Sequence, residues 1–186
     1  MITLAIDTST ARGSVALLDG NRLVAEETFE RDGIFEAIGK LKPGDCDLIL
    51  VGVGPGSFTG IRAGLAAAKG LALPRSVPIR AVSSFDALAL TALPEVPAEY
   101  RQMCVHADAR RGEIYFALYD RVGKPLTPCR IGTRELVTGG LREPTWWVSA
   151  PPVYPRAALL AQVAPVELPL EPIYLRETEY RKISTH

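Results

Sequence analysis

Two segments of the chain carry side chains whose types and spacing suit the binding of a phosphate group. The first is Asp7-Thr8-Ser9-Thr10, which closes the apolar run 2–6 and precedes Gly13-Ser14. In such a turn, hydroxyls and backbone N–H groups can contact a phosphate while the carboxylate organises a metal such as Mg²⁺. The same residue types also satisfy tight turns that bind nothing, which is their commoner use. Both interpretations stay open from these residues alone.

The second segment is Gly54-Pro55-Gly56-Ser57-Phe58-Thr59-Gly60, which opens a helix predicted over residues 61–73. Free N–H groups and the helix dipole favour an anion at such a helix start. The segment has neither the lysine of a GxxxxGK[ST] loop nor a GxGxxG pattern. Sharp turning at the glycines, with Ser57 or Thr59 as the helix cap, explains it equally well. The candidate phosphate-binding residues are therefore Asp7, Thr8, Ser9, Thr10, Gly54, Gly56 and Ser57.

Small residues recur at spacings of three and four along the helix predicted over 61–73. Such a face lets another backbone approach closely. Each glycine inside a helix costs roughly 1 kcal/mol relative to alanine, and a close contact would offset that cost. The contact is either with the chain's own sheet or with a partner helix, in a homodimer or a heterodimer. The candidate partner interface is Gly60, Ala63, Gly64, Ala67, Ala68 and Lys69.

The other chemically reactive side chains do not form a catalytic or metal-binding set. Three cysteines and two histidines are too few and too scattered to predict a zinc site or a disulfide framework. The charged segment 108–113 is expected to be a solvated hairpin tip with local ion pairs. His106 lies in an apolar run, and Trp146-Trp147 are expected in the core of the second half. We predict no catalytic residue, no metal and no cofactor.

Apolar runs and turn residues place these segments on a mixed α/β framework. Strands predicted over 2–6, 13–18 and 22–29 form a meander, followed by a two-turn helix over 34–41. A strand over 47–53, the helix over 61–73, a strand over 79–82 and a helix over 85–93, capped by Ser83-Ser84, come next. Further strands are predicted over 103–107 and 114–119, and a short helix over 156–163. From residue 125 onward the chain is Pro-rich, with only short candidate elements.

Pro94 and Pro97 mark a break in this order. We therefore predict two domains, 1–97 and a smaller 98–170, with the tail 171–186 packing back on the first.

The balance of charge limits the partners that this chain can bind by itself. Lys and Arg number 21 and so do Asp and Glu, so the formal net charge is zero. A protein that grips nucleic acid electrostatically needs a cation for each neutralised phosphate, so RNA is expected to be reached through another protein. The odd number of cysteines and the absence of a signal-like or membrane-spanning run predict a cytoplasmic protein.

Together these segments resemble the TsaB/YeaZ family. The matching segments are, in chain order, 4–10 with 13–17, 54–64, 66–72, 82–88, 108–115 and 171–176. The resemblance implies an actin-like (ASKHA, ribonuclease H-like) fold, with a second, smaller and degenerate copy. It also implies a degenerate paralogue of TsaD that has no catalytic role of its own.

Within that family the resemblance implies pairing with TsaD and cooperation with the ATPase TsaE. The complex transfers a threonylcarbamoyl group to N6 of adenosine 37 in tRNAs that read ANN codons. Contact with tRNA is then expected only through the complex, and the isolated chain could form a homodimer. An independent ATPase or kinase of the actin-like superfamily is the alternative.

One segment departs from the family pattern. Residues 31–40 are shorter than the family's usual helix and hold no histidine. We therefore expect the partner interface to differ in detail from that of the family.

Overall fold

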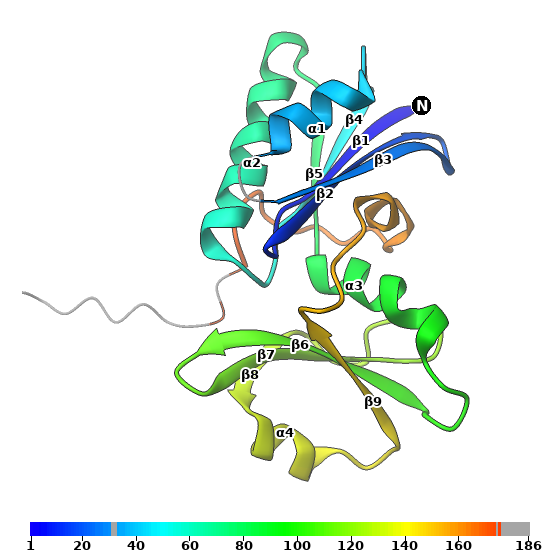
Figure 1. Ribbon diagram of the computed structural model, residues 1–186, viewed down its shortest axis with the longest axis vertical. Helices are drawn as coiled ribbons and strands as arrows, with labels where there is room; N and C mark the ends of the chain where they lie inside the picture. Colours follow the sequence, from blue (N-terminus) through cyan, green and yellow to red (C-terminus); the bar gives the residue numbers. More distant parts are fainter. Residues whose placement is uncertain (31–32, 174, 176–186) are drawn as a thin grey trace, which may run out of the picture.

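The computed structural model describes residues 1–30, 33–173 and 175, which build two β-sheets with helices around and between them (Figure 1). The first sheet has five strands in the order β3-β2-β1-β4-β5, and the second has four in the order β8-β7-β6-β9. The predicted α/β class, with mixed sheets flanked by helices, is confirmed.

The first sheet begins with the predicted meander. Its strands are β1 (Ile2–Asp7), β2 (Arg12–Asp19), β3 (Arg22–Glu30), β4 (Leu48–Gly52) and β5 (Ile79–Val82). β1 pairs antiparallel with β2 and parallel with β4. The parallel pair is possible because the chain crosses from β3 to β4 through a helix rather than through a tight hairpin. That helix, α1 (Ile34–Leu41), has the predicted bounds.

The helix α2 (Phe58–Ala72) begins three residues before the predicted start at residue 61. Ser57 is its N-cap, and its Oγ accepts a hydrogen bond from the N–H of Gly60 at 3.2 Å. Because this cap satisfies a free N–H of the first turn, Phe58 and Thr59 already belong to the helix rather than to the loop. The short 3₁₀ helix η1 (Leu73–Arg75) follows and contains Pro74, which ends α2 as expected.

The second sheet repeats the topology of the first. After α3 (Ser84–Ala92) and the 3₁₀ helix η2 (Leu93–Glu95), the strands β6 (Gln102–Arg110), β7 (Glu113–Tyr119) and β8 (Arg130–Thr133) form another meander. The helix α4 (Arg134–Gly140) then leads to β9 (Thr145–Ala150), which lies parallel to β6 as β4 lies parallel to β1. A counterpart of β5 is missing from the described part. The predicted second, smaller copy is confirmed by this order of elements.

Three clusters of buried side chains hold the elements in place. α1 and α2 cover one face of the first sheet, where Leu4, Ile6 and Ile49 are buried. α3 lies between the two sheets, with Ala87 in the core of the first and Phe85 in the core of the second. α4 lies on the far side of the second sheet (Figure 1).

The segment after β9 returns to the first sheet. The predicted helix over 156–163 is instead a 3₁₀ helix, η3 (Ala157–Gln162), which packs on the first sheet through Ala157 and Leu160. Six residues between the extended Arg156 and the extended Val163 allow only a short helix, and 3₁₀ geometry is common in such pieces. Ile173 N–H then donates to Val53 O at 2.9 Å. The predicted boundary between residues 97 and 98 stays a prediction, and most of the tail 171–186 lies outside the described residues.

Glu26 ties the returning segment to β3. Its Oε2 accepts from Arg156 Nη2 at 2.6 Å and Nε at 2.9 Å, and its Oε1 accepts from Ala158 N at 3.1 Å. We expect Glu26→Ala to lower the free energy of unfolding by about 1–3 kcal/mol, because it leaves these donors without their charged acceptor. Urea unfolding measures this. The control Glu30→Ala, at an exposed position of the same strand, should change it by less than about 0.5 kcal/mol.

None of the helices in the described ranges is long and apolar enough to cross a lipid bilayer.

Candidate functional site

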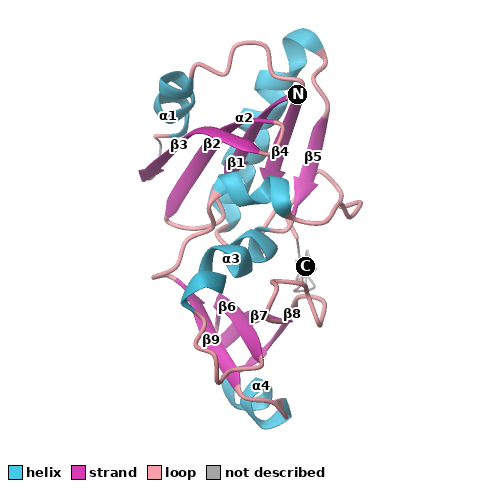
Figure 2. Ribbon diagram, turned by 90° about the vertical axis from the view of Figure 1, so that its right-hand side faces the viewer, coloured by secondary structure: helices cyan, strands magenta, loops and turns pink. Residues whose placement is uncertain are grey.

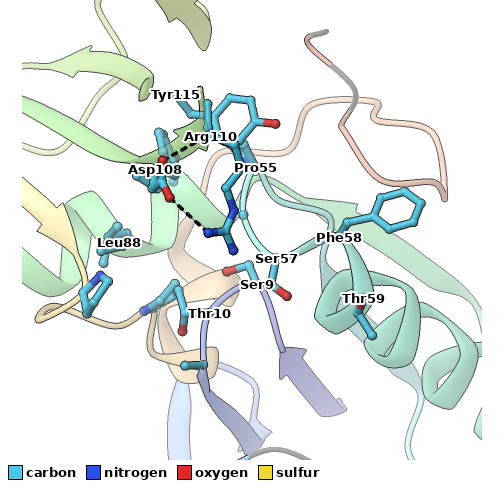
Figure 3. Close-up of a pocket in the computed structure, with 18 residues that line it drawn as sticks. Ser9, Thr10, Pro55, Ser57, Phe58, Thr59, Leu88, Asp108, Arg110 and Tyr115 are labelled. Atoms are coloured by element: carbon cyan, nitrogen blue, oxygen red, sulfur yellow. Dashed lines mark hydrogen bonds and ion pairs between the residues drawn. The ribbon is translucent and has the colours of Figure 1, made fainter. Parts of the chain in front are cut away.

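A cleft of about 560 Å³ opens between the two halves of the molecule (Figure 3). Ser9 and Thr10 of the β1–β2 turn and Gly56 and Ser57 before α2 line one side. The β6–β7 hairpin lines the other, with Asp108, Arg110 and Tyr115. The fold thus brings both predicted phosphate-binding segments to one place, opposite the charged hairpin.

The cleft offers few free donors for an anion. Ser9 Oγ donates to Asp7 Oδ1 at 2.7 Å, and Thr10 Oγ1 donates to Arg12 O at 2.6 Å. Among the described residues that line the cleft, Arg110 is the only cationic side chain, and it lies 3.6 Å from Asp108 Oδ2. The hydroxyls of Ser9 and Thr10 are therefore used within the chain, and the Arg110 side chain is already beside a carboxylate.

Asp7 does not line the cleft. It is 1% exposed, and its Oδ1 also accepts from Ser9 N at 2.9 Å. Its Oδ2 lies beside the backbone of Gly52 and the Ser84 hydroxyl and has no hydrogen-bond partner within the described residues. Burial raises the pKa of Asp7, and the neighbouring Ser84 and Ser9 groups only partly oppose that rise. The carboxyl group of Asp7 is therefore buried beneath the β1–β2 turn, where it accepts hydrogen bonds from Ser9.

The raised pKa of Asp7 leads to a prediction about stability and pH. The folded chain binds this proton more tightly than the unfolded chain, so the resulting stabilisation is complete at low pH. It is lost as the pH rises from the ordinary value of 3.8 through the higher folded-state pKa. Asp7→Asn stays neutral, and we expect it to raise the free energy of unfolding at pH 7. Urea unfolding over a series of pH values measures both effects. If Asp7→Asn were less stable than the unmodified chain at pH 7, the raised pKa of Asp7 would be contradicted.

The remaining predicted phosphate residues are used to pack the turn against α2. Thr8 Oγ1 donates to Gly60 O at 2.8 Å, and Ser57 N donates to Ser9 O at 2.6 Å. Gly54 N donates to Ser84 Oγ at 3.0 Å. A Cβ at Gly56 would overlap the Ser9 carbonyl, so only glycine fits there.

The residues predicted for the partner interface face in two directions. Gly64, Ala67 and Ala68 are buried inside the chain and Gly60 is half-buried, whereas Ala63 and Lys69 are exposed. A Cβ at Gly60 or Gly64 would overlap Thr8, so these glycines serve a close internal contact. Lys69 Nζ donates to Leu170 O at 3.4 Å.

The outer side of α1 and α2 exposes large apolar side chains that the sequence reasoning did not select. Phe35, Phe58 and Leu73 are 67%, 51% and 80% exposed. A groove of about 470 Å³ lies between the helices, with Phe35 and Ala63 on its walls. Helical periodicity could have found Phe35, because Ile34, Ala37, Ile38 and Leu41 define the buried face and Phe35 lies off it. We call Phe35, Phe58, Ala63, Lys69 and Leu73 the α1–α2 face.

The second half of the chain contributes mainly structural side chains. His106 is buried, its ring lies 5.4 Å from that of Trp147, and burial lowers its pKa. The two tryptophans are half-buried in β9, and Arg134 lies 4.5 Å above Trp147. The described residues contain no cluster of His, Cys, Asp or Glu suited to a metal ion.

Comparison with known proteins places this fold in a family. The family model described as TsaD, tRNA N6-adenosine threonylcarbamoyltransferase, matches residues 34–132, more than half of the chain. The tRNA threonylcarbamoyladenosine biosynthesis protein TsaB of Bacillus subtilis is 35% identical over 132 residues, which cover 64% of this chain and 55% of the relative. The TsaB protein of Haemophilus influenzae is 37% identical over 125 residues, covering 61% and 52%. This chain belongs to the TsaB/YeaZ family.

A solved structure carries the same fold over nearly the whole chain. YeaZ from Pseudomonas aeruginosa superposes with a TM-score of 0.72 at 24% identity, and the match covers 94% of this chain and 99% of that one. The chain spans only about half the length of the TsaB relatives that it matches (55% and 52%). The comparisons give no support to an independent ATPase or kinase.

Proposed function

We propose that this chain is a non-catalytic partner and activator of a TsaD subunit in the formation of threonylcarbamoyladenosine in tRNA. The observation that carries the proposal is the chain's membership of a family whose characterised relatives are named for this biosynthesis. Two features of the molecule support the accessory role. The hydroxyls of Ser9 and Thr10 donate hydrogen bonds within the chain, and Asp7 is buried behind the turn.

The α1–α2 face is our proposed site for TsaD. Its exposed aromatic and apolar groups are typical of the buried centre of a protein–protein interface. Ala63 provides room for close approach, and Lys69 adds one charge at the edge. The same face would join two copies in a homodimer when TsaD is absent. TsaE would then act on the TsaB–TsaD pair, and tRNA would be held by the complex in the cytoplasm.

Reconstitution tests the proposal. The purified chain, its cognate TsaD and TsaE, ATP and the threonylcarbamoyl adenylate precursor would be incubated with unmodified tRNA. We expect negligible modified adenosine with the chain alone, and strong stimulation when it is added to TsaD and TsaE. An unchanged yield on its addition would refute the activator role.

Titration calorimetry separates this proposal from the alternative of an independent nucleotide-binding enzyme. We expect no measurable heat when ATP and Mg²⁺ are added to the isolated chain, because Arg110 is the only cationic side chain among the described lining residues and Asp7 lies outside the cleft. Tight, Mg²⁺-dependent binding would instead support the seven candidate phosphate-binding residues and the alternative function.

A further inference from the structure

The strand β5 forms one edge of the first sheet and leaves part of its backbone without a partner (Figure 2). Pro78 O and Val82 O accept hydrogen bonds from Ile49 N and Val53 N of the neighbouring β4 segment, each at 2.9 Å. Because bonding directions alternate along a parallel strand, Ile79 and Ala81 direct their N–H and C=O groups away from β4. No backbone hydrogen bond from another described residue reaches them on that side.

A groove of about 600 Å³ runs between this edge and residues 165–169. Pro165 and Pro169 are at the two ends of the opposite wall. Proline has no N–H, so Pro165 and Pro169 donate no hydrogen bond, and no backbone hydrogen bond joins this wall to β5 among the described residues. The space beside the edge is therefore open to a separate extended segment.

Arg80 lines this groove, and no described residue forms an ion pair with it. Its Nε is buried and has no hydrogen-bond partner among those residues. An N–H group removed from water is costly unless an acceptor pairs with it, and the Arg80 Nε–H is such a group. A carboxylate placed opposite Arg80 would satisfy it, as oppositely charged neighbours do across paired strands.

We propose that the β5 edge binds an extended acidic segment of a partner protein, which adds to the sheet as a strand and places a carboxylate on Arg80. The unpaired groups of Ile79 and Ala81 supply the main-chain hydrogen bonds, and Arg80 selects the charge. Glu167, an exposed residue on the opposite wall, disfavours further carboxylates there. This surface is separate from the α1–α2 face, and the proposal does not depend on the proposed function.

The test uses the full chain labelled with ¹⁵N and the blocked peptide acetyl-Thr-Val-Glu-Val-Thr-amide as the probe. We expect saturable shifts of the Ile79 and Ala81 amide signals. Replacing Glu of the peptide by Gln, or Arg80→Gln in the chain, should weaken binding about five-fold, as for one partly exposed ion pair. The Glu167→Gln variant should instead bind the peptide more tightly, because it removes from the groove a negative charge that repels the peptide's carboxylate.

Three results would overturn the proposal. One is the absence of saturable shifts at Ile79 and Ala81 up to about 5 mM peptide, which corresponds to negligible affinity. Another is equal binding of the Glu and Gln peptides by the unmodified chain, a comparison that requires no variant to fold. The third is unchanged binding by Arg80→Gln when its amide spectrum shows a retained fold.

Discussion

An Ala63→Arg variant is expected to bind TsaD about a hundred-fold more weakly while its stability stays close to that of the unmodified chain. Ala63 is exposed on α2 and lines the groove between α1 and α2, so a long side chain fits there in the free protein. In the complex it would fill the groove and bury an unpaired charge, at a cost of roughly 3 kcal/mol or more. Calorimetry with purified TsaD measures the affinity, and urea unfolding measures the stability.

The matched control for this prediction is Val122→Arg. Val122 is 72% exposed in the loop after β7, on the second half of the molecule. The same change of size and charge is made there, away from the proposed interface. We expect its affinity for TsaD to be unchanged. Equal affinity of the Ala63→Arg variant would show that TsaD binds another surface.

The first half of the fold could be predicted because its signals are local. The Asp19-Gly20 turn and the alternation on either side of it fix the β2–β3 hairpin, and the apolar spacing of Ile34, Ala37, Ile38 and Leu41 fixes α1. After residue 125, β8, α4 and β9 have four, seven and six residues. β9 pairs with β6, which is distant in the sequence, and the prolines of this region interrupt any regular apolar spacing, so local patterns do not reveal these elements.

The candidate sites were harder to predict than the strands because residue type does not specify the neighbour. The spacing of Gly60 and Gly64 correctly indicates close approach, but the neighbour is Thr8 of the same chain. Asp7 ends β1 as expected, yet its carboxyl group is buried and accepts hydrogen bonds from Ser9, two residues later. Both results depend on where α2 lies over the β1–β2 turn, which is a tertiary property. The partner-facing and phosphate-binding roles of these residues therefore stay predictions.

Two glycines of α2 are expected to respond to the same substitution with opposite signs. A Cβ at Gly60 would overlap the carbonyl oxygen of Thr8, whereas a Cβ at Gly70 would meet nothing within 4 Å. We expect Gly60→Ala to lower the free energy of unfolding by about 2–3 kcal/mol, because backbone must move to relieve the overlap. Gly70→Ala should raise it by about 0.5–1 kcal/mol through better helix propensity. Urea unfolding of the two variants measures both effects.

Gly64 distinguishes a clash with a side chain from a clash with the backbone. Its added Cβ would overlap Thr8 Oγ1, an atom that Thr8→Ala removes. The pair Gly64→Ala with Thr8→Ala should therefore cost less than the sum of the two single changes, by about 1 kcal/mol or more. The same Thr8→Ala change should not rescue Gly60→Ala, because the Thr8 carbonyl oxygen remains. Strictly additive effects at Gly64, or rescue at Gly60, would show that these glycines are required for a contact other than the one with the β1–β2 turn.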